Sequence, residues 1–391
     1  MATYVLLGLM ALVLAAFAGL LRVGGRALAW ETPAQEENPP RWPRLALIVP
    51  VAGASPGLAR RLAALLDQDY PDYQVVFATR DREDPATRVI VDLLRQKPKG
   101  RLVLSGPART CGQKNANLLA GLKLAGEGPE ILAFCDSNQE ALPDFLRRLA
   151  APLARGQARV ASGYHHIIPG DNLLATWGRA VTVLVLHLTK AIPRLNQPWG
   201  GATAIRRDLF TALKVERLWG ETVVDDVSLA ARLIKARIPV AFPPGATLAT
   251  PLSGETWASW YSWLFRQWIY LKYYLPGSWL AAGLFLHLTA ALVMGSLGLL
   301  FLGLLGLAPL DHFWASLGFL GGLTTQTLIL RRCHPGSSSP GLWLASSLAA
   351  LLMASLVHLK TCLTQTITWR GLTYMVDWRG KVVSVREDPG P

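Results

Sequence analysis

The sequence predicts an α/β domain with a Rossmann-like, mostly parallel sheet, joined to apolar membrane helices at its N-terminal and C-terminal ends. Between residues 45 and 135, short apolar runs alternate with segments of helical spacing. This alternation is typical of a parallel sheet with helices on both faces. Outside the domain, residues 3–21, 277–310 and 341–357 carry no charge. Uncharged runs of about 18 or more apolar residues have the length of membrane spans.

The elements of the α/β domain follow from local patterns of apolar and helix-starting residues. Apolar runs predict strands at 45–51, 73–79, 101–104, 130–135 and 159–162. Helical spacing predicts helices at 56–68, 86–96, 115–125, 175–190 and 225–235. The 175–190 segment is apolar on one face, so it is either a core helix or one that lies on the membrane. Segments 203–213 and 239–242 complete the soluble part.

The membrane segments divide the rest of the chain. We assign, in order, an anchor at 1–26, a Pro- and Glu-rich linker at 27–43, the α/β domain at 44–252, an aromatic interfacial segment at 253–276, three or four transmembrane helices at 277–358 and a tail at 359–391. The first run lacks a basic start and ends at Arg22 and Arg26, which indicates an uncleaved anchor. The 277–310 run is either one tilted span or two short ones. Arg331-Arg332 favours an inside loop, but the basic tail is also expected inside, so the topology stays open.

The net charge of +13 favours a membrane partner. The basic residues form no tract, as nucleic acid binding would require, but flank the anchor and scatter over the domain. Cytoplasmic segments of membrane proteins are enriched in Lys and Arg. We therefore expect an integral membrane protein with its α/β domain on the cytoplasmic face of a bacterial-type inner membrane, and no nucleic acid partner. Four widely spaced cysteines fit a reducing compartment rather than a zinc site or a disulfide framework.

Polar side chains follow two of the predicted strands. Asp81 and Asp84 come after 73–79, and Asp136 and Asn138 come after 130–135. Ligands of open α/β sheets bind beyond the carboxyl ends of the strands. Mg²⁺ or Mn²⁺ prefers oxygen ligands and would neutralise a diphosphate-bearing substrate there. The alternative for each aspartate is a loop-capping role.

A glycine and a lysine open the predicted helix at 115–125. Gly112 and Lys114 could hold phosphate through backbone N–H groups and a point charge, although the spacing is not that of a P-loop. The alternative is an ordinary solvated helix start.

Two adjacent carboxylates, Asp225 and Asp226, begin another predicted helix. Neighbours on a helix point in different directions, so one can face a substrate while the other caps or pairs. A second carboxylate nearby raises the pKa of the first, which suits a general base. The alternative is a pair of acids favoured by the helix dipole. The turn Trp199-Gly200-Gly201 precedes them.

Other patterns in the sequence give weaker evidence about function. His165 and His166 are neighbours on a strand and face opposite sides, which argues against a joint metal site. No G-x-S-x-G motif supports a hydrolase. Residues 257–274 are rich in Trp and Tyr, as at a lipid–water interface; the alternative is an aromatic belt without a chemical role.

Several motifs resemble the membrane glycosyltransferases of family 2 and, more narrowly, the ceramide glucosyltransferase-like family 21. These are QDYPDYQVVFATRDREDPA at 68–86, GQKNANL, WGGATAIRRDLF and TWRGLTY at 368–374. The resemblance covers about residues 45–276 and implies a GT-A fold and an inverting reaction. The family's (Q/R)xxRW signature is altered: residues 264–268 read Leu-Phe-Arg-Gln-Trp. This departure disfavours a processive polysaccharide synthase.

The resemblance also implies roles for residues. Asp226 would be the catalytic base. Donor-binding residues would be Asp81, Asp84, Lys114, Asp136, Arg266, Gln267 and Trp268. The acceptor or sugar would contact Trp199, Gly200, Gly201 and Asp225, and Asp136 with Asn138 would hold the metal. The expected reaction transfers a hexose from a UDP-sugar, such as UDP-glucose, to a membrane lipid hydroxyl such as that of ceramide. The alternatives are a polysaccharide synthase of the same fold or a non-catalytic membrane scaffold.

Overall fold

The computed structural model describes residues 2–29, 39–192, 195–243 and 245–387, and its centre is a six-stranded sheet. The strand order within this described part is β3-β2-β1-β4-β7-β5. Their bounds are β1 Leu45–Pro50, β2 Tyr73–Thr79, β3 Gly100–Leu104, β4 Ile131–Cys135, β5 Val160–Ser162 and β7 Ala202–Arg206. The first four run parallel, and β7 runs antiparallel to both of its neighbours. The prediction of a mostly parallel α/β sheet is confirmed, and the arrangement agrees with the GT-A architecture that the resemblance implied.

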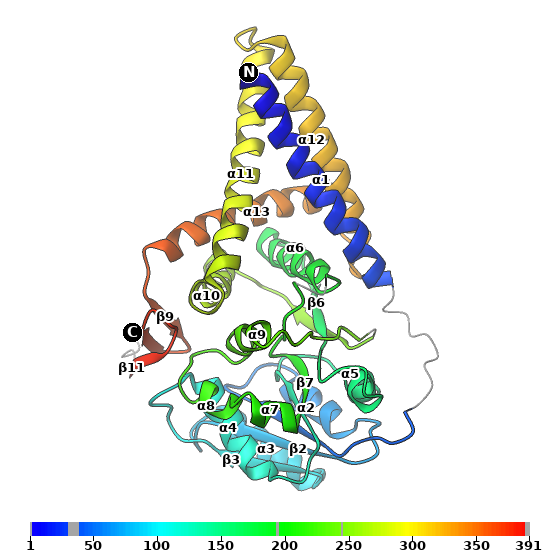
Figure 1. Cartoon of the computed structure of the whole chain (residues 1–391), viewed down its shortest axis with the longest axis vertical. Helices are drawn as coiled ribbons and strands as arrows, with labels where there is room; N and C mark the ends of the chain where they lie inside the picture. Colours follow the sequence, from blue (N-terminus) through cyan, green and yellow to red (C-terminus); the bar gives the residue numbers. More distant parts are fainter. Residues whose placement is uncertain (1, 30–38, 193–194, 244, 388–391) are drawn as a thin grey trace.

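Helices bury both faces of this sheet (Figure 1). Along β1, Leu45, Leu47 and Val49 enter the core on one face, whereas Ala46 and Ile48 enter the core on the other. A strand buried on both faces reads as a continuous apolar run, which is why the sequence pattern located it. One face carries α2 Leu58–Leu66, α3 Pro85–Gln96 and α5 Phe145–Ala154. The other carries α4 Gln113–Ala125, α7 Arg207–Ala212, α8 Val215–Trp219 and α9 Asp226–Lys235.

A second layer lies between the sheet domain and the membrane helices. It contains α6 Leu174–Thr189, α10 Trp257–Tyr274 and a parallel pair of strands, β6 Tyr164–Pro169 and β8 Thr247–Leu252. Trp260 of α10 is fully buried against Gly178 of α6, where an added Cβ would collide with the indole ring. Sequence analysis treated His165 and His166 as strand neighbours, which β6 confirms, but it gave no bounds for β6 and did not predict β8. The segment 239–242 forms only an isolated bridge, between Ala241 and Ala161 of β5.

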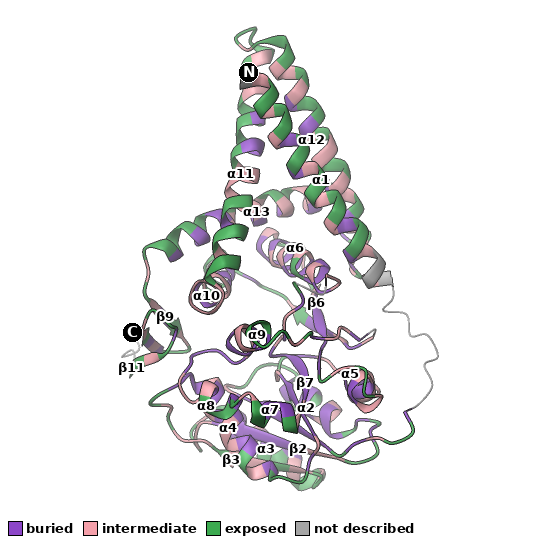
Figure 2. Ribbon diagram, in the orientation of Figure 1, coloured by how far each residue is buried: buried purple, intermediate pink, exposed green. Residues whose placement is uncertain are grey.

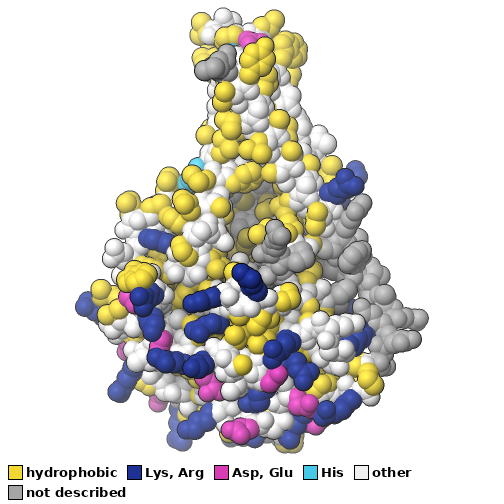
Figure 3. All heavy atoms as spheres, viewed as in Figure 1, with side chains coloured by type: hydrophobic (Ala, Val, Ile, Leu, Met, Phe, Trp, Pro, Cys, Tyr) yellow, Lys and Arg dark blue, Asp and Glu magenta, His cyan; other side chains and the backbone are white. Residues whose placement is uncertain are grey.

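Three apolar helices form a column that rises from this layer (Figure 1). They are α1 Ala2–Ala29, α11 Pro276–Leu304 and α12 Leu310–Arg331. Thr3 and His312 approach within 3.5 Å at its tip. Hydrophobic side chains cover the column, whereas Lys and Arg gather over the domain (Figure 3). Of the two alternatives for the 277–310 run, the structure has the single helix: α11 covers most of the run, and a short loop leads to α12. A fourth long apolar helix, α13 Pro340–Cys362, runs across the base of the column; all four have the length and composition to cross a membrane.

The C-terminal tail folds back onto the α/β domain. It forms an antiparallel sheet of β9 Thr366–Trp369, β10 Leu372–Val376 and β11 Val382–Glu387. Tyr374 is fully buried, and its hydroxyl accepts a hydrogen bond from the Gln113 backbone N–H at the start of α4 (3.1 Å). Residues 30–38 of the expected linker lie outside the described residues. Buried residues (purple) concentrate in the sheet and exposed ones (green) on the column (Figure 2).

Candidate active site

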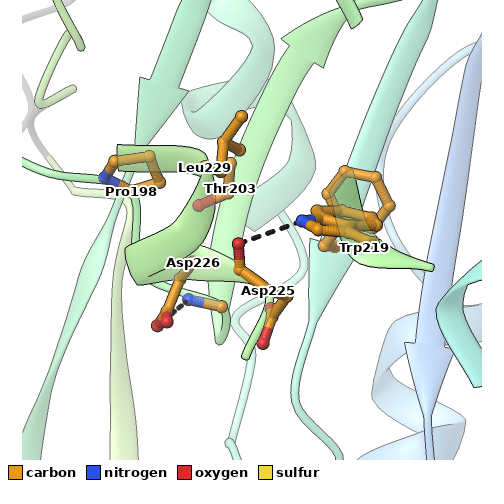
Figure 4. A pocket seen from close by; sticks show the side chains of 8 residues that line it. Pro198, Thr203, Trp219, Asp225, Asp226 and Leu229 are labelled. Carbon is orange, nitrogen blue, oxygen red and sulfur yellow. Dashed lines mark hydrogen bonds between the residues drawn. The ribbon is translucent and has the colours of Figure 1, made fainter. Parts of the chain in front are cut away.

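The two carboxylates at the start of α9 lie beside a small pocket but have different surroundings (Figure 4). Asp226 is partly exposed, and each of its oxygens accepts one backbone hydrogen bond, Oδ2 from Gly200 N (3.0 Å) and Oδ1 from Val227 N (2.7 Å). An ionised carboxylate has about four acceptor positions, so Asp226 keeps capacity for another donor. Asp225 is 2% exposed, and its backbone carbonyl is fixed by the Trp219 indole N–H (3.0 Å).

Lys114 joins two carboxylates from different elements. Its Nζ lies 2.9 Å from Asp136 Oδ1, after β4, and 3.1 Å from Asp225 Oδ1. Burial lowers the pKa of Lys114, but the charges of Asp136, Asp225 and Asp226 outweigh burial and raise it above its usual value. Burial raises the pKa of Asp225 to about 6, although Lys114 opposes this shift. At neutral pH the group is therefore a charged lysine that holds two carboxylates.

Glycines allow the backbones around this lysine to approach closely. A Cβ on Gly200 would lie 2.5 Å from both Lys114 Nζ and Asp225 Oδ2. A Cβ on Gly112, directly before α4, would collide with the Val223 carbonyl, and Gly112 N donates to Thr222 O (2.9 Å). Such close approach is a standard use of glycine. The GQKNANL and WGG motifs thus bring the start of α4 and the 199–201 turn against the start of α9.

Aromatic rings line one side of the carboxylates. Trp199 stacks on His165 with ring centroids 4.4 Å apart and planes 9° apart, and Tyr164 meets Trp199 edge-on. His165 Nδ1 lies 2.6 Å from Thr250 Oγ1, so β6 and β8 fix the imidazole. Burial lowers the pKa of His165 well below its usual value, so the ring is neutral at pH 7. Gly201 lies directly under the Trp199 ring, where a Cβ would clash.

The aspartates after β2 stabilise their own loop. Asp84 Oδ1 caps α3 by accepting from Ala86 N (2.9 Å), and it also accepts from Gly53 N (2.8 Å) after β1. Asp81 accepts from the Asp84 backbone N–H (2.9 Å) and pairs with Arg80 (3.2 Å). Both aspartates therefore make loop-capping contacts after β2, and Asp84 also joins the loop after β1.

The charges near α9 suit a divalent cation. Asp136 and Asp225 contact Lys114, and Asp226 lies within electrostatic reach of both Lys114 and the buried Lys190, so three carboxylates face two cations. Asn138 is exposed and adds an amide oxygen two residues after Asp136; that oxygen accepts from Gln139 (2.9 Å). Among the residues that the structure describes, no cluster of three or more His, Cys, Asp or Glu forms a complete metal cage. Mg²⁺ typically needs only one or two protein carboxylates when substrate phosphates supply other ligands, so these residues fit such an ion.

A pocket of about 320 Å³ between α10 and the C-terminal sheet contains two arginines. It is lined by Tyr261, Ser262, Phe265, Arg266, Thr368, Trp369 and Arg370. Arg370 donates to the Ala52 carbonyl, which links the pocket to the loop after β1. Burial lowers the pKa of Arg266, and no acid pairs with it in the described part of the chain. Two neighbouring guanidinium groups without an acid between them are chemically suited to an anion.

Arg266, Gln267 and Trp268, the expected donor-binding residues of the altered (Q/R)xxRW signature, do not face the same environment in the structure. Arg266 faces the pocket, but the Gln267 amide bonds the Trp263 carbonyl of its own helix (3.4 Å), and Trp268 packs edge-on against His358 of α13. Sequence reasoning assigned no role to Arg370. The TWRGLTY motif was the signal for it, but only the folded tail shows that this arginine reaches the carboxyl edge of the sheet.

Two solved structures have similar folds. One is a mannosyltransferase from Pyrobaculum calidifontis, solved with GDP-Man and Mn²⁺, which is 18% identical over 90% of this chain and 99% of its own, with a TM-score of 0.46. The other is glucosyl-3-phosphoglycerate synthase from Mycobacterium tuberculosis, solved with Mn²⁺, UDP-glucose and phosphoglyceric acid. It is 17% identical over 59% of this chain and 74% of its own, with a TM-score of 0.36. The family model described as Glycosyl transferase family 21 matches residues 5–382, so the chain belongs to that family and is a glycosyltransferase.

Proposed function

We propose that this glycosyltransferase moves a hexose from a UDP-sugar, with UDP-glucose as the first candidate, to a hydroxyl group of a membrane lipid such as ceramide, with inversion. The observation that carries the proposal is the difference between the two carboxylates of α9. Asp225 is buried and paired with Lys114, whereas Asp226 is partly exposed, is held by two backbone N–H groups and retains acceptor capacity. Asp226 is therefore the residue available to take a proton from an acceptor.

In the proposed reaction, Asp226 accepts the proton of the lipid hydroxyl as its oxygen attacks the anomeric carbon. The bond from that carbon to the diphosphate breaks on the opposite side, and UDP leaves with the electron pair. A positioned base typically contributes about 10²–10⁴-fold to such a step. The turn of Trp199, Gly200 and Gly201 remains the proposed sugar- or acceptor-side wall, because the Gly200 backbone N–H donates to Asp226 (3.0 Å).

Arg266 and Arg370 are suited to stabilise the departing diphosphate, because both cations face one pocket. Stabilising charge that develops in the transition state is often the largest single contribution to catalysis. Asp136 and Asn138 would hold Mg²⁺ or Mn²⁺, which when bound neutralises diphosphate charge. Lys114 keeps the carboxylates from repelling an anionic donor, because it already compensates Asp136 and Asp225.

A lipid acceptor is favoured by the position of this site. The α10 helix joins the arginine pocket directly to α11 of the apolar column. Among the column side chains that the structure describes, the basic residues Arg22, Arg331 and Arg332 lie toward the domain end, whereas the tip carries Asp311 and His312. Because Lys and Arg mark the cytoplasmic side of membrane proteins, we place the catalytic domain on the cytoplasmic face.

The proposal is tested by measuring UDP release from the full chain in lipid nanodiscs. A panel of UDP-sugars is offered with Mg²⁺ or Mn²⁺, with and without ceramide, diacylglycerol or a total lipid extract. We expect release with one sugar that depends on both the metal and one lipid class. Formation of long sugar chains as the product would favour a polysaccharide synthase. Absence of binding of any UDP-sugar would favour a non-catalytic scaffold.

A further inference from the structure

Both ends of α13 are attached to the catalytic side of the molecule. Just before the helix, His334 Nε2 lies 3.0 Å from the Ile167 carbonyl of β6. At the other end, Lys272 of α10 donates to the carbonyls of Thr361 (2.6 Å) and Thr364 (3.0 Å). A helix of 23 residues is about 34 Å long, enough to cross the roughly 30 Å apolar core of a bilayer. A crossing helix would carry one end away from the domain, and α13 does not.

Between its two ends, α13 also packs against the helices of the layer next to the α/β domain. Near its start, Trp343 meets Trp177 of α6 edge-on at 6.1 Å, and its indole N–H donates to the Thr327 carbonyl of α12 (2.8 Å). Near its end, His358 meets Trp268 of α10 at 4.9 Å. The helix therefore lies over α6 and α10, across the base of the column formed by α1, α11 and α12 (Figure 1).

The two faces of α13 have the polarity of a lipid-facing helix. The face buried against the protein contains Ser346, Ser355, His358 and Thr361. The exposed residues follow a spacing of three and four residues through Gly341, Ala345, Leu348, Leu352, Leu356 and Leu359; Lys360 and Cys362 are exposed at the C-terminal end of the helix, and Leu363 is exposed directly after it. A helix facing water has the opposite arrangement, with charged residues outside. This leucine row lies next to the equally apolar surface of the column, so the two can share one apolar environment.

We propose that α13 does not cross the membrane but lies in the plane of its surface, with the leucine row (Leu348, Leu352, Leu356, Leu359, Leu363) in contact with lipid acyl chains. Only α1, α11 and α12 then span the bilayer. Arg331 and Arg332 before α13, and Lys360 near its end, reach the headgroups of one leaflet. This arrangement satisfies both charge preferences that the sequence left in conflict, because the 331–332 loop and the tail lie on the same side. It is independent of the reaction proposed above.

Topology is tested with single cysteines and a membrane-impermeant maleimide in sealed vesicles of both orientations. The background is Cys333→Ser with Cys362→Ser, which keeps the buried Cys111 and Cys135 and must itself remain unlabelled. Ser337→Cys and Gln365→Cys report the two ends of α13, Lys99→Cys reports the catalytic domain and Asp311→Cys the tip. We expect the first three to label from one side and Asp311→Cys from the other. Labelling of Ser337→Cys and Gln365→Cys from opposite sides would overturn the proposal.

Depth is tested with bimane attached at Leu348→Cys or Leu359→Cys in vesicles that contain brominated phosphatidylcholine. The two positions are separated by about 16 Å along the helix axis. A helix in the surface plane places both at one depth, so shallow bromines should quench both labels equally and more strongly than bromines at the bilayer centre. Different depths at the two positions would indicate a spanning helix. No quenching at either would indicate that a second copy or solvent covers the leucine row, and would also overturn the proposal.

Discussion

At the scale of single residues, the neighbours Asp225 and Asp226 acquire different roles from partners distant in sequence. The pair of acids at a helix start was visible in the sequence, as was the glycine turn before it. Which acid is available depends on Lys114, because its ammonium group pairs with Asp225 and leaves Asp226 to the backbone of Gly200. Local periodicity contains no information on such a contact, so sequence reasoning named Asp226 only through the family resemblance.

The raised pKa of Asp225 predicts a pH-dependent stability. Its pKa is about 6 in the folded chain against an ordinary value near 4, so between these values the folded state keeps a proton that the unfolded chain has released. Stability contributed by this proton is present below about pH 4 and is lost as pH rises through 6. Relative to Asp225→Asn, the melting temperature of the wild type should fall by about 2 °C between pH 4.5 and 7. If the melting temperature of the wild type minus that of Asp225→Asn stayed constant or rose with pH, the prediction would be contradicted.

Arg370 offers a direct test of the arginine pocket. Hydrogen bonds to charged groups contribute about 1.5–3 kcal/mol, so Arg370→Ala should weaken donor binding by roughly 10–100-fold. Arg379→Ala is a matched control from the same C-terminal sheet, since Arg379 packs over Trp378 and does not line the pocket. UDP-sugar affinity is measured by calorimetry in detergent. Equal affinities for the two variants would remove Arg370 from the donor site.

At the scale of elements, the crossing of α6 and α10 determines where the arginine pocket lies. Gly178 lets the fully buried Trp260 approach the α6 backbone, and overpacking of such a contact typically costs 1–3 kcal/mol. Gly178→Ala should therefore lower the melting temperature and weaken donor binding, because α10 carries Arg266. Gly298→Ala is the control, since a Cβ there meets nothing within 4 Å. Similar melting curves for the two variants would show that the crossing is not tightly packed.

Elements of the parallel sheet could be predicted from sequence, whereas several others could not. Strands such as β1 and β2 are buried on both faces and are therefore continuous apolar runs. The strands β6 and β8 form a two-stranded sheet, with one isolated bridge from Ala249 of β8 to Glu140, and include polar or proline residues, so no continuous apolar run marks them. The C-terminal strands are short and partly exposed. Their position depends on Tyr374 and Arg370, whose partners lie in the first half of the chain.

At the scale of the whole molecule, the chain combines a mostly parallel sheet domain, a helical layer and an apolar column. The sequence predicted the sheet domain and apolar helices at both ends, but could not say that α13 rests on the domain. Composition gives the length and apolarity of a helix, and both suit a span as well as a surface helix. The direction of α13 is determined by contacts at its two ends, which only the folded chain contains.

The most direct test of the proposed reaction is sugar transfer by Asp226→Asn in proteoliposomes, with the donor and lipid that support UDP release by the wild type. The same preparation is used to measure donor affinity, so that a loss of binding is distinguished from a loss of chemistry. We predict that transfer falls by about 10²–10⁴-fold while donor affinity stays within a few-fold of the wild type. Wild-type turnover by Asp226→Asn would contradict the assignment of Asp226 as the base.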